Sequence, residues 1–152
     1  MTENINGVKA TISTVVAAMT ALWGWFGWLI ILWIACTTLD YFTGSGAAVK
    51  NGQWNSSTSK EGIWHKVGCA VAILVAGAFD MLVGSILGNI PGVTLPFEYT
   101  VLLCPLVLVW YILTELGSII ENAAAMGAPV PPFLLKALQK GKDAADQAGE
   151  KM

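Results

Sequence analysis

Three long stretches of the chain are almost free of charged residues. No acidic or basic residue occurs from Ala10 to Leu39 or from Tyr99 to Thr114. From Val67 to Phe97, only Asp80 interrupts the apolar sequence. Because a helix of about 20 mostly apolar residues can cross the hydrocarbon core of a bilayer, the pattern predicts an all-α integral membrane protein with about three transmembrane helices.

The same pattern sets the expected boundaries of a single membrane domain, residues 1–152. In order, its segments are an amphipathic lead (1–21), a first span (22–43), a cytoplasmic loop (44–66), a second span (67–88), an outer loop (89–97), a third span (98–126) and a cytoplasmic tail (127–152). The tail is expected to carry an amphipathic helix. A fourth span within the lead is the alternative that hydrophobicity leaves open.

Lysines orient the predicted spans. They gather in the 44–66 loop and in the tail, two segments that share one side of the membrane when there are three spans. Because lysine-rich segments favour the cytoplasmic side, we expect an N-out, C-in orientation. Trp54 and Trp64 lie among the loop lysines, which is typical of a segment resting on anionic headgroups.

Composition narrows the class of protein further. Hydrophobic residues make up 55% of the chain and charged residues only 12%, whereas a soluble domain averages about 25% charged. The net charge is −2, without a basic block to follow phosphates, so we expect a lipid bilayer as partner and no nucleic acid. Three cysteines, Cys36, Cys69 and Cys104, each fall within an apolar stretch and are expected to be buried free thiols.

Little in the sequence suggests catalysis. His65 is the single histidine, and no nucleophile, phosphate loop or group of metal ligands accompanies it. We therefore expect no enzyme activity, no cofactor and no bound metal.

Several polar residues lie at or near the expected membrane depth. A charge at mid-bilayer costs at least about 2.5–3.5 kcal/mol, so such residues usually face protein or water. Asp40 and Glu121 lie near the expected cytoplasmic ends of the first and third spans. There, extending to the membrane interface or pairing with Lys66 is as good an explanation as a specific functional role. The candidate polar or pore-lining residues are Asp40, Asp80, Glu115, Ser118, Glu121 and Asn122.

Small residues recur at intervals of four along the second span and include Asp80. Such spacing lets helix backbones approach closely, although the stripe drifts by about 40° at each step of four residues. We expect this small-residue stripe to serve helix packing or oligomerisation. Its members are Gly68, Ala72, Ala76, Asp80, Gly84 and Gly88.

Two segments resemble the phage holin family that also includes toxin-secretion holins. LDYFTGSGAAVKNGQWNSSTSKEGIWHKVG is similar to the family's stretch between the first two spans, and ELGSIIENAAAMGAPVPPFLLKAL is similar to its C-terminal signature. The family has no agreed catalytic residues, so these residues carry over as motif positions only. They are Asp40, Gly44, Ser56, Ser57, Lys60, Gly62, Lys66, Glu115, Ser118, Glu121, Asn122, Gly127, Pro129 and Pro131.

The resemblance implies a small protein of the bacterial cytoplasmic membrane that accumulates, forms homo-oligomers and opens lesions. A phage endolysin, or a toxin, would cross the membrane through these lesions, and no stable contact between it and this chain is implied. Two other classes stay open from the residues themselves. One is a small ion-coupled or proton-coupled transporter or channel component, and the other is a structural membrane protein that never permeabilises.

Overall fold

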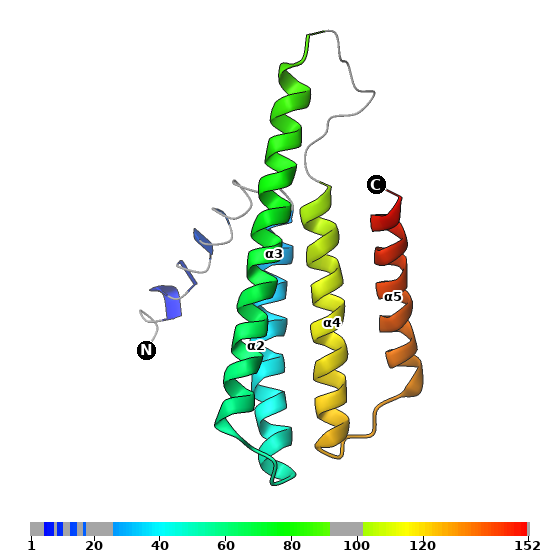
Figure 1. Ribbon diagram of the computed structural model, residues 1–152. Helices are drawn as coiled ribbons and strands as arrows, with labels where there is room; N and C mark the ends of the chain where they lie inside the picture. The colour runs from blue at the N-terminus through cyan, green and yellow to red at the C-terminus, as the bar shows by residue number, and fades with distance from the viewer. Residues whose placement is uncertain are drawn as a thin grey trace.

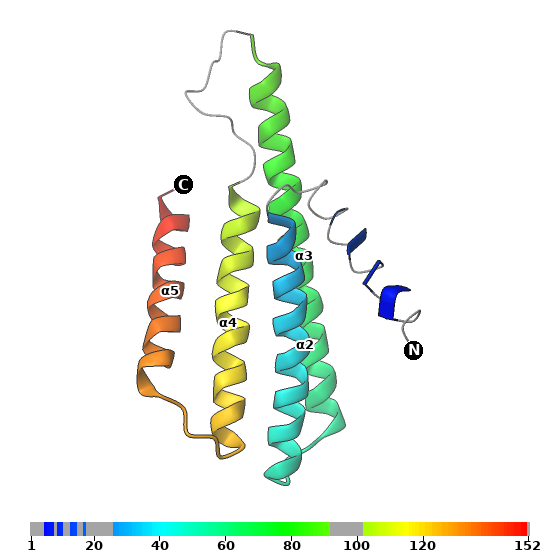
Figure 2. The ribbon, with the colours of Figure 1, turned by 180° about the vertical axis from the view of Figure 1, so that it is seen from behind.

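The computed structural model describes residues 5–7, 9–10, 13–14, 17, 26–91 and 102–151. Its main elements are four helices: α2 (Gly27–Lys50), α3 (Ser56–Asn89), α4 (Leu103–Ala125) and α5 (Pro132–Glu150). They lie side by side, with α4 packed against each of the other three (Figures 1 and 2). The prediction of an all-helical protein is confirmed for the described part of the chain.

Three of these helices are long and apolar enough to cross a membrane. The candidate spans are Gly27–Lys50, Lys60–Asn89 and Leu103–Ala125. This result confirms the three spans that the charge-free stretches predict. The amphipathic lead falls largely outside the described residues, as does most of the outer loop.

The three spans share a core built from one face of each helix. On α3 the buried positions are Cys69, Ile73, Ala76 and Asp80, at alternating spacings of four and three that keep them on one side. The rest of the core comes from α2 and α4, which contribute Leu29, Trp33, Cys36, Cys104, Leu108 and Ile112. All three cysteines are buried and free, as expected.

The outer surface of the spans is apolar. Leu74 and Met81 on α3 are 68% and 73% exposed, and Phe42 on α2 is 67% exposed. In water such surfaces would be unfavourable, but they match the acyl chains of a bilayer.

The predicted 44–66 loop is wrong in extent, because most of it is helical. Only residues 51–55 connect α2 to α3. α2 continues through Gly44 to Lys50, where Ala47 is buried within the fold. The connection turns at Gly52, which has a positive φ of 66°, and the Asn55 side chain then accepts the Ser57 N–H to cap α3. A local cap and turn therefore replace a long loop.

The C-terminal helix turns back along the bundle. A linker at 126–131 follows α4, with Gly127 at φ 92° and a bond from the Ala128 N–H to the Ala123 carbonyl that closes the helix end. α5 then runs antiparallel to α4, so that its end lies near the start of α4 (Figures 1 and 2). The cytoplasmic placement of the tail stays a prediction.

Candidate functional site

One lysine joins the three spans. Lys66 lies on α3, and its ammonium is 2.8 Å from Asp40 Oδ2 on α2 and 2.7 Å from Glu115 Oε2 on α4. The side chains of Lys66, Asp40 and Glu115 are only 16%, 18% and 7% exposed. At this burial, an unpaired carboxylate or ammonium would be costly, so the pairing fixes which faces of the three helices meet.

An amide completes the network around Asp40. Asn122 Nδ2 on α4 donates to Asp40 Oδ1 at 3.0 Å and to Thr43 Oγ1 at 3.2 Å. Both oxygens of the Asp40 carboxylate are thus engaged, one by Lys66 and one by Asn122. We call Asp40, Thr43, Lys66, Glu115 and Asn122 the polar network. Thr43 is absent from the sequence-based candidates, although its position three residues after Asp40 places it on the same helical face.

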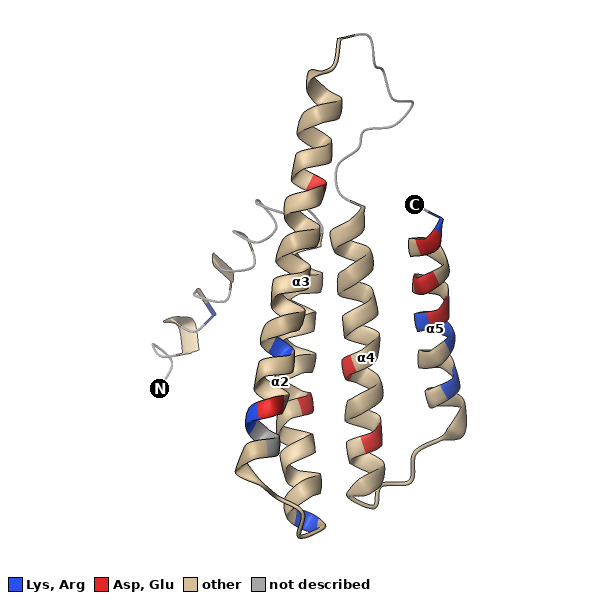
Figure 3. Ribbon diagram, in the orientation of Figure 1, with Lys and Arg blue, Asp and Glu red and all other residues tan. Residues whose placement is uncertain are grey.

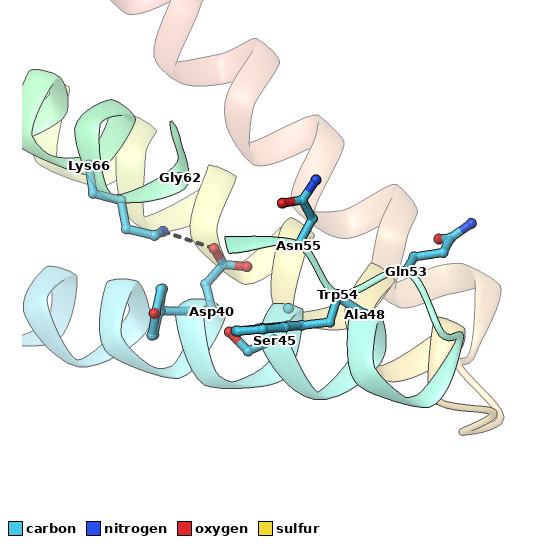
Figure 4. A pocket seen from close by; sticks show the side chains of 10 residues that line it. Asp40, Ser45, Ala48, Gln53, Trp54, Asn55, Gly62 and Lys66 are labelled. Carbon is cyan, nitrogen blue, oxygen red and sulfur yellow. Dashed lines mark hydrogen bonds and ion pairs between the residues drawn. The ribbon is translucent and has the colours of Figure 1, made fainter. Parts of the chain in front are cut away.

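The network has an open pocket beside it, between α2 and the beginning of α3. The pocket has a volume of about 240 Å³ and is lined by Asp40 and Lys66 together with Tyr41, Ser45 and Trp54. Figure 4 shows the Asp40 and Lys66 side chains meeting next to the Trp54 ring. The polar network is therefore reached from the α2–α3 turn.

α2 and α4 pack closely at Gly44, next to Asn122 of the polar network, and substitutions at Gly44 test this contact. A Cβ at Gly44 would lie 3.4 Å from Asn122 Nδ2, which is ordinary contact, so Gly44→Ala should fold normally. Gly44→Leu should push Asn122 away from Asp40 and cost about 1–3 kcal/mol, the usual range for overpacking. Thermal unfolding in detergent micelles measures both. Gly62→Leu is the matched control, since nothing lies within 4 Å of a Cβ there. Equal losses at Gly44 and Gly62 would contradict the assignment.

Asp80 forms a second polar contact, within the bundle. Its carboxylate accepts the Leu103 N–H at 3.0 Å and the Cys104 N–H at 2.7 Å, and the residue is only 2% exposed. These are the first two residues of α4, and the third, Pro105, has no N–H to satisfy. Asp80 of α3 thus caps α4, and its negative charge meets the positive end of the helix dipole.

The other end of α4 also receives a side chain from a neighbouring helix. The Lys50 ammonium, in the last turn of α2, donates to the backbone carbonyl of Met126. A cation is favourable near the C-terminus of a helix because the last carbonyls lack partners. Sequence reasoning treated Lys50 only as a topology signal.

The small-residue stripe does not keep to one face. Ala76 and Asp80 lie inside the fold, Ala72 and Gly84 are half-buried, and Gly68 and Gly88 are exposed. A Cβ at Gly68 or Gly88 would meet nothing within 4 Å. The drift of the stripe around α3 explains this division.

The remaining candidates lie apart from the network. Ser118 and Glu121 line a groove between α4 and α5. Ser56 and Ser57 begin α3, Lys60 and Gly62 are exposed on its first turns, and Gly127, Pro129 and Pro131 fall in the linker after α4. Of the motif positions, the structure brings together Asp40, Lys66, Glu115 and Asn122, with Gly44 in contact.

Three apolar helices, joined by a largely buried polar network, with α4 capped at both ends by side chains of its neighbours, define a multi-pass helical membrane protein. Residues 17–143 match the model of the bacteriophage holin family. The chain belongs to that family, whose members permeabilise membranes and are not typically enzymes.

Relatives extend the similarity over most of the chain. An uncharacterised protein of Halalkalibacterium halodurans is 31% identical over 131 residues, which cover 86% of this chain and 90% of that protein. An uncharacterised 14.9 kDa protein of Clostridium perfringens, from the nagH 3′ region, is 29% identical over 140 residues, or 92% of this chain and 96% of its own. No solved structure matches.

Proposed function

We propose that this chain is a holin that oligomerises in the bacterial cytoplasmic membrane and forms lesions. The lesions would release an endolysin, or a toxin, and trigger lysis of the host cell. The observation that carries the proposal is the convergence of both motif segments on the polar network of a three-span family member. This convergence gives four motif residues, Asp40, Lys66, Glu115 and Asn122, a shared physical role, which is to hold the three spans in one arrangement.

The distribution of polar and apolar surface supports this function. Asp40, Asp80 and Glu115 are engaged inside the bundle, while the outward faces of α2 and α3 carry large apolar side chains that suit lipid. A chain built in this way can accumulate in a bilayer as an intact bundle. Self-association would then use outward surface, including Gly68 and Gly88 at the ends of the small-residue stripe.

The position of the lysines supports the proposed orientation of the chain in the membrane. The α2–α3 connection and the linker after α4 lie at one end, where Lys50 and Lys60 also lie (Figures 1 and 3). Placing this end in the cytoplasm gives the N-out topology with the tail entering from inside.

Induced expression in a bacterium tests the function directly. We expect growth to continue until an abrupt collapse of the membrane potential, which a potential-sensitive dye would record. Co-expressed endolysin should then reach the cell wall and lyse the culture, whereas endolysin alone should not. Steady growth and potential at high membrane levels of the protein would overturn the holin proposal and favour a structural role. A gradual ion flux that Asp80→Asn abolishes without loss of assembly would favour a transporter.

A further inference from the structure

α5 reaches the depth of the spans although it is strongly charged. Trp110, in the third turn of α4, donates from Nε1 to Asp146 Oδ1 at 2.8 Å. The Lys142 ammonium lies 4.4 Å from the centre of the Trp110 ring, within the range of a cation–π contact. Where α4 crosses a bilayer, docked α5 therefore stands beside it at membrane depth.

The contact with α4 uses small residues spaced four apart. Ala145 is only 7% exposed. A Cβ at Gly141 would lie 3.1 Å from Leu113 Cδ1, and one at Gly149 would lie 3.6 Å from Leu106 Cδ2. Because these residues are small, α5 can pack closely against α4 in the docked position.

A polar stripe follows the side of α5 away from α4. Its end members reach the edges of the contact, because Lys136 and Glu150 each line a groove between the two helices. Its members follow one another at alternating spacings of four and three, which keeps them on one side of a helix. Over 14 residue steps, the stripe extends about 21 Å, at a rise of 1.5 Å per residue. All are exposed, and Figure 3 shows α5 as the helix with the densest charge. The members of this α5 polar stripe are Lys136, Lys140, Asp143, Gln147 and Glu150.

Lipid is an unfavourable neighbour for this stripe, since each charge at mid-bilayer costs at least about 2.5–3.5 kcal/mol. Water is the alternative. In the described part of the spans, the outward faces of α2 and α3 are apolar, and the acids Asp40, Asp80 and Glu115 bond within the bundle. Within the described residues, the α5 polar stripe is therefore a long polar surface that can line a water-filled path.

We propose that α5, docked on α4, forms the water-facing wall of the lesion, with its polar stripe toward the lumen. The proposal rests on the proposed holin function. Before assembly, lipid would surround α4, so α5 would lie instead in the headgroup region, as amphipathic helices do. The earlier candidates for lining the path, Asp40, Asp80 and Glu115, would then hold the bundle together behind this wall.

A cross-link tests whether α5 stays docked in the open state. The pair Leu113→Cys and Gly141→Cys joins α4 to α5, at positions where a Gly141 Cβ lies 3.8 Å from Leu113 Cγ. The full chain, with its three native cysteines changed to alanine, is reconstituted in a planar bilayer under a KCl gradient. Conductance is recorded before and after oxidation of the pair, and reduction serves as the reversal control. We expect the oxidised chain to conduct as the reduced chain does.

Charge reversal then tests which face meets the ions. In the cross-linked chain, Lys136→Glu with Lys140→Glu should raise the potassium-to-chloride permeability ratio several-fold, because fixed charges along a lumen select counter-ions. Lys60→Glu, at the exposed start of α3, is the matched control and should leave the ratio nearly unchanged.

The outcomes separate the two proposals. Absence of conductance from the chain with its native residues would overturn the holin function. Conductance that oxidation abolishes would show that α5 must leave α4, and would overturn the lumen wall alone. An unchanged permeability ratio in the cross-linked double lysine variant would also overturn it.

Discussion

Replacing Lys66 with methionine should lower the free energy of unfolding by about 3 kcal/mol, the lower end of the usual cost of removing one partner from a buried ion pair, because Glu115 is buried whereas Lys66 and Asp40 are half-buried. Methionine keeps the length of the side chain but leaves the carboxylates of Asp40 and Glu115 without a cation between α2 and α4. Their repulsion should separate the helices that the network joins. Unfolding of the purified chain in detergent micelles, followed by circular dichroism, measures the loss.

Neutralising the carboxylates should recover much of that stability. The triple variant Lys66→Met, Asp40→Asn, Glu115→Gln has no uncompensated buried charge, and replacing a whole buried ionic group is often nearly neutral. Lys60→Met, on the exposed start of the same helix, is the control and should change stability by less than about 0.5 kcal/mol. If Lys66→Met matches this control, the network does not hold the spans together.

The helices were predictable because their signal is local. Long apolar stretches identify each span without reference to the others, and the structure confirms three candidate spans. Helix ends were harder to predict, because polar residues between the first two spans look like a loop. They are helical because Asn55 caps α3 and Ala47 packs inside the fold, and the second of these contacts is tertiary.

The partners of the polar residues were not predictable to the same degree. Asp40 and Asn122 bond across 82 positions of sequence, and Glu115 meets Lys66 across 49. Such pairs depend on how helices rotate and shift against one another, which periodicity within one helix does not specify. Sequence could name the carboxylates and offer Lys66 as a partner for Asp40, but it could not show that one ammonium serves two acids.

Asp80 illustrates the same limit at a single residue. In the sequence it stands alone in an apolar span, which suggests contact with another copy or with water. Its carboxylate reaches the first N–H groups of α4 only because α3 and α4 pack against each other, and the sequence of one helix does not show that packing. The pore-lining and oligomerisation roles of Asp80 stay predictions, whereas its capping contact is a feature of the single chain.

Replacing Asp80 with leucine should destabilise the bundle by about 3 kcal/mol, since each buried N–H left without an acceptor costs about 1–3 kcal/mol. Leucine is similar in size but accepts no hydrogen bond from the Leu103 or Cys104 N–H. The next residue, Pro105, has no N–H, so it offers no other donor through which this turn could be held. Asp80→Asn should lose less, because its amide oxygen still accepts one N–H. Unfolding in micelles gives the ranking, with the exposed Asp143→Leu as control.

Amide hydrogen exchange gives the local form of this prediction and distinguishes a cap from a pore-lining acid. In Asp80→Leu, the Leu103 and Cys104 amides should exchange at least about ten times faster, because 1.4 kcal/mol of lost local stability corresponds to a tenfold change. Amides near Ile112, two turns further along α4, should change much less if the global stability still protects them. Unchanged exchange at Leu103 and Cys104, together with altered conductance, would show that Asp80 acts on the aqueous path and not on the helix start.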